Sequence, residues 1–166
     1  MMTLPITTPE RIIAVMLLSP DKFHYYSFGV QLMMMVSNEA VLQRASRRWI
    51  DKLKQVDAEI EVIFSNAMIH ACKSGELVVS NADQDTTMDA ISVGIWSMHV
   101  GFIQVAYQRR ALEDQKHSIN PTFPVTTDHG FIKSAQLLIN SFPWKNPLGA
   151  QSIEKAQALL TERNFR

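Results

Sequence analysis

One periodic pattern constrains the fold of this chain more than any other feature. From Trp49 to Ala67, apolar residues recur at alternating spacings of four and three, and Ala71 follows after a further four. Residues at this spacing share one face of an α-helix, so the pattern predicts a long amphipathic helix from about Arg47 to Lys73. Lys73-Ser74-Gly75 is expected to end that helix, because a basic last turn followed by glycine is common at helix C-termini.

Cap and turn signals divide the rest of the chain into further helices. Ser19-Pro20-Asp21 is typical of a helix start, and it opens an almost wholly apolar segment, 21–36, which must be buried on most sides. Asn38 and Glu39 start a short helix, and the other predicted helices cover residues 10–18, 86–108, 129–142 and 152–164. No alternating run is long enough for a sheet. The sequence predicts one all-α domain over residues 1–166, with a core at about 8–142 and a C-terminal helical extension at about 143–166.

Charge and composition exclude several classes of protein. Sixteen Lys plus Arg balance sixteen Asp plus Glu, so no overall field attracts nucleic acid or an anionic membrane. The single cysteine, Cys72, excludes an internal disulfide. The first residues lack the pattern of a secretory signal, and the apolar stretch 91–106 is interrupted by polar residues. We therefore expect a soluble cytoplasmic protein without a membrane partner.

The search for catalytic and metal-binding motifs is negative. The sequence contains no phosphate-binding glycine loop, no HExxH and no GxSxG. Cys72 is expected to be a small buried hydrophobe, and Asp21 with His24 fits a helix start better than a metal pair. A basic run is interpreted as a solvated face and consists of Arg44, Arg47, Arg48, Lys52 and Lys54. An enzyme using His99 or His24 is disfavoured because neither histidine has an evident partner. We expect no enzyme, no metal and no cofactor.

Soft and aromatic residues on the predicted buried helices suit an adaptable apolar pocket. The residues expected to contact a ligand are Tyr26, Met33, Phe64, Met68, Trp96 and His99. Plain core packing uses the same residue types, and the pattern does not choose between the two interpretations.

A stripe of small residues marks the helix predicted at 86–108. Ala90, Gly94, Ser97 and Gly101 lie on one side, opposite a mostly apolar face that includes Trp96 and His99. Two glycines in a helix interior cost up to about 1 kcal/mol each, and close approach of another helix would offset that cost. The approaching helix is either 129–142 of the same chain or the same helix of a two-fold partner.

The order of these elements resembles a known family. The long helix closes with Lys73-Ser74-Gly75-Glu76-Leu77, a polar bridge with Asp83 and Asp85 follows, and the next helix runs from Met88-Asp89-Ala90 through Trp96 to Gly101. This arrangement is similar to the C-terminal regulatory domain of TetR-family transcriptional repressors. The resemblance covers roughly Thr8 to Phe142.

The resemblance implies a regulatory function. Helices 86–108 and 129–142 would form a four-helix homodimer interface, in which Leu138 joins the small-residue stripe, and the other helices would enclose a small apolar or amphipathic effector. The family's helix-turn-helix domain has no counterpart before Thr8, so we expect this chain to reach DNA only through a domain that it lacks. The connection 109–128 and the extra last helix also depart from the family pattern. The alternative from another class is a stand-alone helical adaptor that binds a protein partner through its apolar helices.

Overall fold

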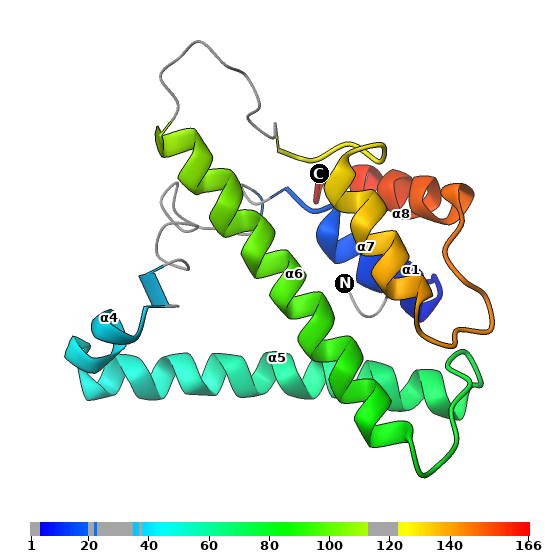
Figure 1. The fold of residues 1–166 in the computed structure, drawn as a ribbon, viewed down its shortest axis with the longest axis horizontal. Helices are drawn as coiled ribbons and strands as arrows, with labels where there is room; N and C mark the ends of the chain where they lie inside the picture. The colour runs from blue at the N-terminus through cyan, green and yellow to red at the C-terminus, as the bar shows by residue number, and fades with distance from the viewer. Residues whose placement is uncertain (1–3, 20–21, 23–34, 37, 113–122) are drawn as a thin grey trace.

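The structure is a computed structural model that describes residues 4–19, 22, 35–36, 38–112 and 123–166. The described residues contain no strand, and an isolated bridge pairs Leu77 with Trp144. The expected all-α fold is confirmed (Figure 1). The helices are α1 (Thr8–Met16), α4 (Glu39–Arg44), α5 (Arg47–Lys73), α6 (Gln84–Leu112), α7 (Gly130–Asn140) and α8 (Ala150–Glu162).

Helix α1 is the centre of the core. It packs against α8, α7 and the C-terminal part of α5, and α7 packs in turn against α6. Its Ile12 and Ile13, and the C-cap residue Leu17, are at most 1% exposed. Because α1 is only nine residues long, its stability depends on this packing more than on its own hydrogen bonds.

Two carboxylates cap the N-terminus of α1. The helix begins at Thr8, two residues before the expected Glu10, because the Glu10 carboxylate turns back and accepts a hydrogen bond from the Thr7 N–H at 2.8 Å. Glu76, from the turn after α5, accepts the Thr8 N–H at 2.8 Å. Glu10 is almost fully buried and forms a salt bridge with Lys155 of α8 at 3.5 Å. These contacts tie α1 to α8 and to the turn between α5 and α6.

The expected C-terminal extension belongs to the same core. Trp144, Ile153 and Leu160 are buried with the residues of α1, and the Trp144 indole N–H donates to the Ile139 carbonyl at 2.9 Å. Arg166 donates from its guanidinium to the carbonyls of Leu17 and Val125, at 2.8 Å each. The hydrophobic core therefore does not end near residue 142, as was expected, but includes residues of the C-terminal segment.

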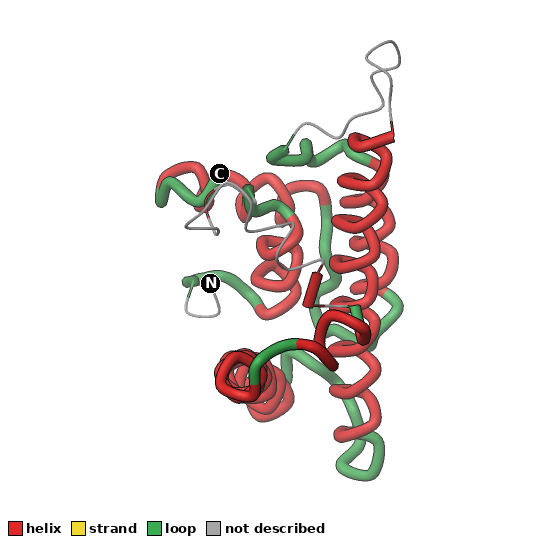
Figure 2. The backbone as a smooth tube through the Cα atoms, turned by 90° about the vertical axis from the view of Figure 1, so that its left-hand side faces the viewer, coloured by secondary structure: helices red, strands yellow, loops and turns green. Residues whose placement is uncertain are grey.

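Helix α5 has a buried end and an exposed end. Its bounds agree with the predicted 47–73, with the Ser46 hydroxyl accepting the Trp49 N–H at the start and Gly75 at φ 73° just past the end. Only Ala67, Met68 and Ala71 of α5 are buried. The part before Ala67 extends away from the core, beyond the crossing with α6, and carries α4 at its free end (Figures 1 and 2).

The remaining helix starts differ from the expected ones. Helix α6 begins at Gln84 rather than at Thr86, after a turn in which Ser80 and Asp83 hydrogen-bond each other. Helix α7 is capped by the His129 ring, which accepts the Phe131 N–H, and not by Thr127 or Asp128. Helix α8 begins after Gly149 rather than at Ser152. Each start was predicted from a residue type that is common at the N-cap. In the structure a different residue occupies the N-cap, His129 for α7 and Gly149 for α8.

Helix α6 also differs from the expectation in its hydropathy. Within Gln84–Arg109, an 18-residue window has a mean hydropathy of 1.3, so α6 is long and apolar enough to cross a bilayer. Core helices of soluble proteins pass the same test but are mostly buried, whereas 22% of this window is buried. Ile91, Ile95 and Ile103 are buried against the rest of the chain, so the length and composition of α6 by themselves do not establish a membrane span.

Candidate functional site

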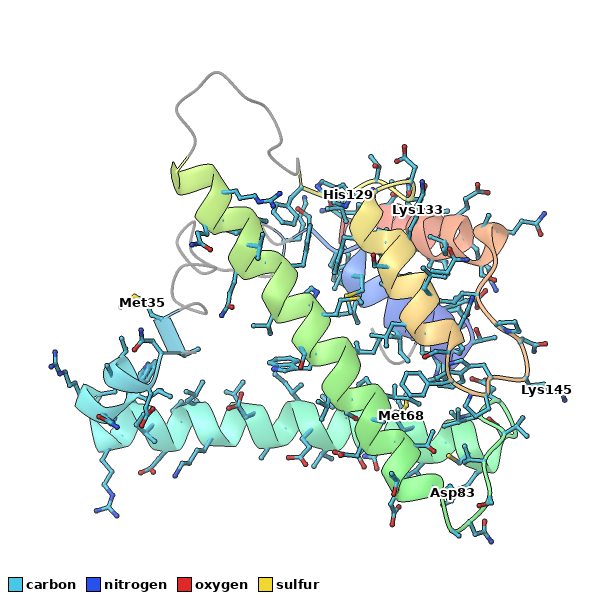
Figure 3. All side chains as sticks on the ribbon, in the orientation of Figure 1. Met35, Met68, Asp83, His129, Lys133 and Lys145 are labelled. Carbon is cyan, nitrogen blue, oxygen red and sulfur yellow. The ribbon has the colours of Figure 1, made fainter. Side chains whose placement is uncertain are left out.

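The structure separates the residues that were expected to contact a ligand. Met68 is fully buried where α5 and α6 cross, and Phe64 packs against the edge of the same core (Figure 3). His99 is half-buried on α6, whereas Trp96 is 57% exposed. Tyr26 and Met33 lie outside the described residues, as do Asp21 and His24.

The expectation that Trp96 faces inward is wrong for the single chain. Helix α6 is apolar on most of its circumference, so its sequence does not reveal which side faces the core. Packing selects the side that carries Ile91, Ile95 and Ile103. Trp96 follows Ile95 by about 100° around the helix axis and falls outside the buried side.

His99 lies in a layer of sulfur and aromatic groups between α6 and its neighbours. Its Nδ1 is 3.2 Å from the Met16 sulfur, and burial lowers the pKa of its imidazole. Phe131 of α7 lies 6.4 Å from the His99 ring and stacks on Phe102 at 3.9 Å between centroids. Phe102 also meets the ring of His129 edge-on at 5.6 Å. The sequence analysis did not name Met16, Phe102 or Phe131 as neighbours of His99, although Phe102 follows His99 by three and so shares its side of α6.

The small-residue stripe is partly filled from within the chain. A Cβ on Gly94 would lie 3.5 Å from a Leu138 methyl group, so α7 occupies the space beside this glycine. Leu138 and Gly94 thus pack against each other within the chain, and their assignment to a dimer interface stays a prediction. The alternative of packing within the chain holds at this position.

The rest of the stripe remains open. A Cβ on Gly101 would meet nothing within 4 Å, and Ala90 and Ser97 are exposed. Val93 and Val105 are exposed on α6, and Leu137 of α7 is 74% exposed. Helices α6 and α7 lie in one layer, on the side of the molecule away from α8 (Figure 2). We call this surface the α6–α7 face; it consists of Ala90, Val93, Ser97, Gly101, Val105 and Leu137.

Charge is absent from the long exposed helix of this face. Between Asp89 and Arg109, α6 carries no Asp, Glu, Lys or Arg. Exposed helix surfaces normally carry charged side chains, which keep a soluble protein from associating. An uncharged exposed surface with small residues at its centre has the chemistry of a helix-packing interface.

The basic run and the cysteine have no comparable arrangement. All five cations of the run are exposed, as expected for a solvated face. Two open hollows of about 500 and 590 Å³ flank Trp49 near this run, and the lining found for them includes none of Phe64, Met68, Trp96 and His99. Cys72 is half-buried rather than fully buried, and burial raises the pKa of its thiol. Among the described residues, no group of three or more His, Cys, Asp or Glu could hold a metal ion.

Comparison of the chain with protein-family models, with curated proteins and with solved structures finds no match.

Proposed function

We propose that this chain is the dimerising regulatory domain of a TetR-like transcriptional regulator. The observation that carries the proposal is the α6–α7 face, where an exposed stretch of α6 free of charged residues lies beside the exposed Leu137. The same two helices are the dimer helices in the family that the sequence resembles. A two-fold dimer that buried this face would cover Val93, Val105 and Leu137 from both copies.

Gly101 is the position at which a partner helix would come closest. Glycine in a helix interior costs about 1 kcal/mol relative to alanine, and no group of the described residues approaches Gly101 closely enough to explain its presence. Close contact with a second helix would offset that cost, because a larger side chain would hold the two backbones apart.

The experiment is a Gly101→Leu substitution followed by sedimentation at tens of micromolar protein. A Cβ on Gly101 meets nothing within 4 Å in the single chain, so the fold is expected to remain while the particle mass falls by half. Circular dichroism checks that helicity is kept.

Gly149→Leu is the matched control. Gly149 is also open, has φ −101°, which any residue adopts, and lies away from the α6–α7 face. The control should leave the mass unchanged. A parent protein that sediments as a monomer, or a Gly101→Leu protein that keeps the parent mass, contradicts the proposed interface.

Effector binding is the second part of the proposal, and it rests on the resemblance together with the groups around His99. Met16, Phe102 and Phe131 are soft or aromatic and adapt to apolar ligands, while the imidazole supplies a polar atom that can orient one. The ligand class is a small apolar or amphipathic molecule. Under this proposal the effector would act on the layer that supports the α6–α7 face.

A further inference from the structure

The exposed part of α5 carries an apolar stripe that the α6–α7 face does not explain. We call residues 47–66 the α5 arm. Val56, Ile60 and Ile63 of the arm are 39%, 46% and 55% exposed. The same stripe continues into the core at Ala67 and Ala71, where it is buried. One continuous helix face is therefore covered at its C-terminal end and open along the arm.

The spacing along the arm is that of a coiled coil. Trp49, Leu53, Val56, Ile60 and Ile63 follow one another at spacings of four, three, four and three. This is the spacing of a seam that packs against another helix through alternating knobs and holes.

Charges beside the stripe indicate the partner. Lys52 and Glu59 are seven residues apart and flank the same edge of the stripe. Both are exposed, and Gln55 connects them, accepting from Lys52 at 3.4 Å and donating to Glu59 at 3.0 Å. The edge of the stripe is thus positive toward the N-terminus of the arm and negative toward the core.

We propose that the α5 arm pairs antiparallel with the α5 arm of a second copy of this chain. With Leu53 packed against Val56 of the second copy, residue 52 is level with residue 57 of that copy. Lys52 then lies within two residues, or about 3 Å along the axis, of Glu59 on the facing edge. The two-fold symmetry forms this pair twice. A single helix edge that complements itself when reversed favours a second copy over an unrelated partner.

The packing of the rest of the chain agrees with the antiparallel direction. The core lies at the C-terminal end of the arm (Figure 1). Antiparallel arms place the two cores at opposite ends of the pair, whereas parallel arms crowd them at the same end. In a parallel pair, Lys52 would face Asp57 instead of Glu59, which makes the two directions distinguishable by charge exchange.

Charge reversal tests the proposal in the full chain. We expect K52E and E59K each to raise the dissociation constant of the arm contact at least about tenfold at low salt, because both symmetric pairs become repulsive. The double variant K52E/E59K should restore the parent value, since the exchanged charges attract again. Sedimentation equilibrium measures these constants. Matched controls are K54E and E61K, which are exposed on the arm but off the stripe, and they should leave the parent constant unchanged.

A second variant removes the apolar contact itself. With both two-fold contacts formed, the smallest closed assembly of the parent is a tetramer. I60E should reduce it to a dimer held by the α6–α7 face, and I60E combined with Gly101→Leu should give a monomer. An unchanged mass in I60E overturns the arm pairing. A K52E/E59K protein whose dissociation constant does not return to the parent value also overturns it, and would place the arms parallel or against another partner. If K52E weakens association and Gly101→Leu does not, the result contradicts the α6–α7 interface and leaves the arm pairing supported.

Discussion

Glu76 shows how one side chain joins distant parts of this fold. It follows the glycine that ends α5, and its carboxylate accepts the Thr8 N–H at the start of α1. Its backbone carbonyl accepts the Lys145 N–H at 2.8 Å. The sequence indicated the turn from Gly75, but the partners of Glu76 lie far away along the chain. Local patterns therefore predicted the helix end and not the cap that the next residue supplies.

His99 makes stability depend on pH. Burial lowers its pKa in the folded state below the usual value of about 6.5, so the unfolded chain binds more protons just below that pH. The contribution of neutral His99 to stability is therefore complete above about pH 6.5 and is lost as the pH falls toward the lowered pKa. We expect urea denaturation to show a lower free energy of unfolding at pH 5.5 than at pH 7.5.

His99→Gln should flatten this dependence, because glutamine does not titrate. His70→Gln, at an exposed position on α5, is the control for the histidine-to-glutamine exchange itself. The slope attributable to one histidine is at most about 1.4 kcal/mol per pH unit. Equal slopes in the parent and His99→Gln would contradict the assignment.

Gly94 is the helix position at which small-residue packing within the chain is directly visible. Alanine there would bring its Cβ to 3.5 Å from the Leu138 methyl, an ordinary van der Waals distance. Because alanine is favoured in helices by about 1 kcal/mol over glycine, we expect Gly94→Ala to raise the free energy of unfolding by about 0.5–1 kcal/mol. Urea denaturation at matched protein concentration measures it. A loss of stability would mean that α6 and α7 are packed more closely than the Leu138 distance indicates.

Individual helices were predictable to different degrees. The bounds of α5 followed from its apolar spacing, Ser46 and Gly75, which act within one or two turns. The exposure of the arm did not follow, because a spacing shows which residues share a face and not whether a neighbour covers it. Helix α6 shows the converse: its length was approximately correct, yet its nearly uniform apolarity left Trp96 and His99 on the same expected side.

Effector binding should change the stability of the whole molecule. A ligand that binds only the folded state raises the melting temperature of the protein. We expect a screen of small apolar and amphipathic compounds to yield ligands that stabilise the parent by about 2.7 kcal/mol at a hundredfold excess over the dissociation constant. His99→Leu should lose most of this stabilisation, and His70→Leu should keep it. Hits that stabilise both variants equally would place the ligand away from His99.

The central position of α1 has a consequence for how this protein is made. Helix α1 is synthesised before α7 and α8, the two later helices against which it packs. Contacts between distant segments form slowly, because the chain loses the entropy of closing a long loop before those contacts can stabilise it. Ile12, Ile13 and Leu17 therefore stay exposed until α7 and α8 have been synthesised. A ribosome-bound chain that stops before α8 is expected to be a client of chaperones that hold apolar segments.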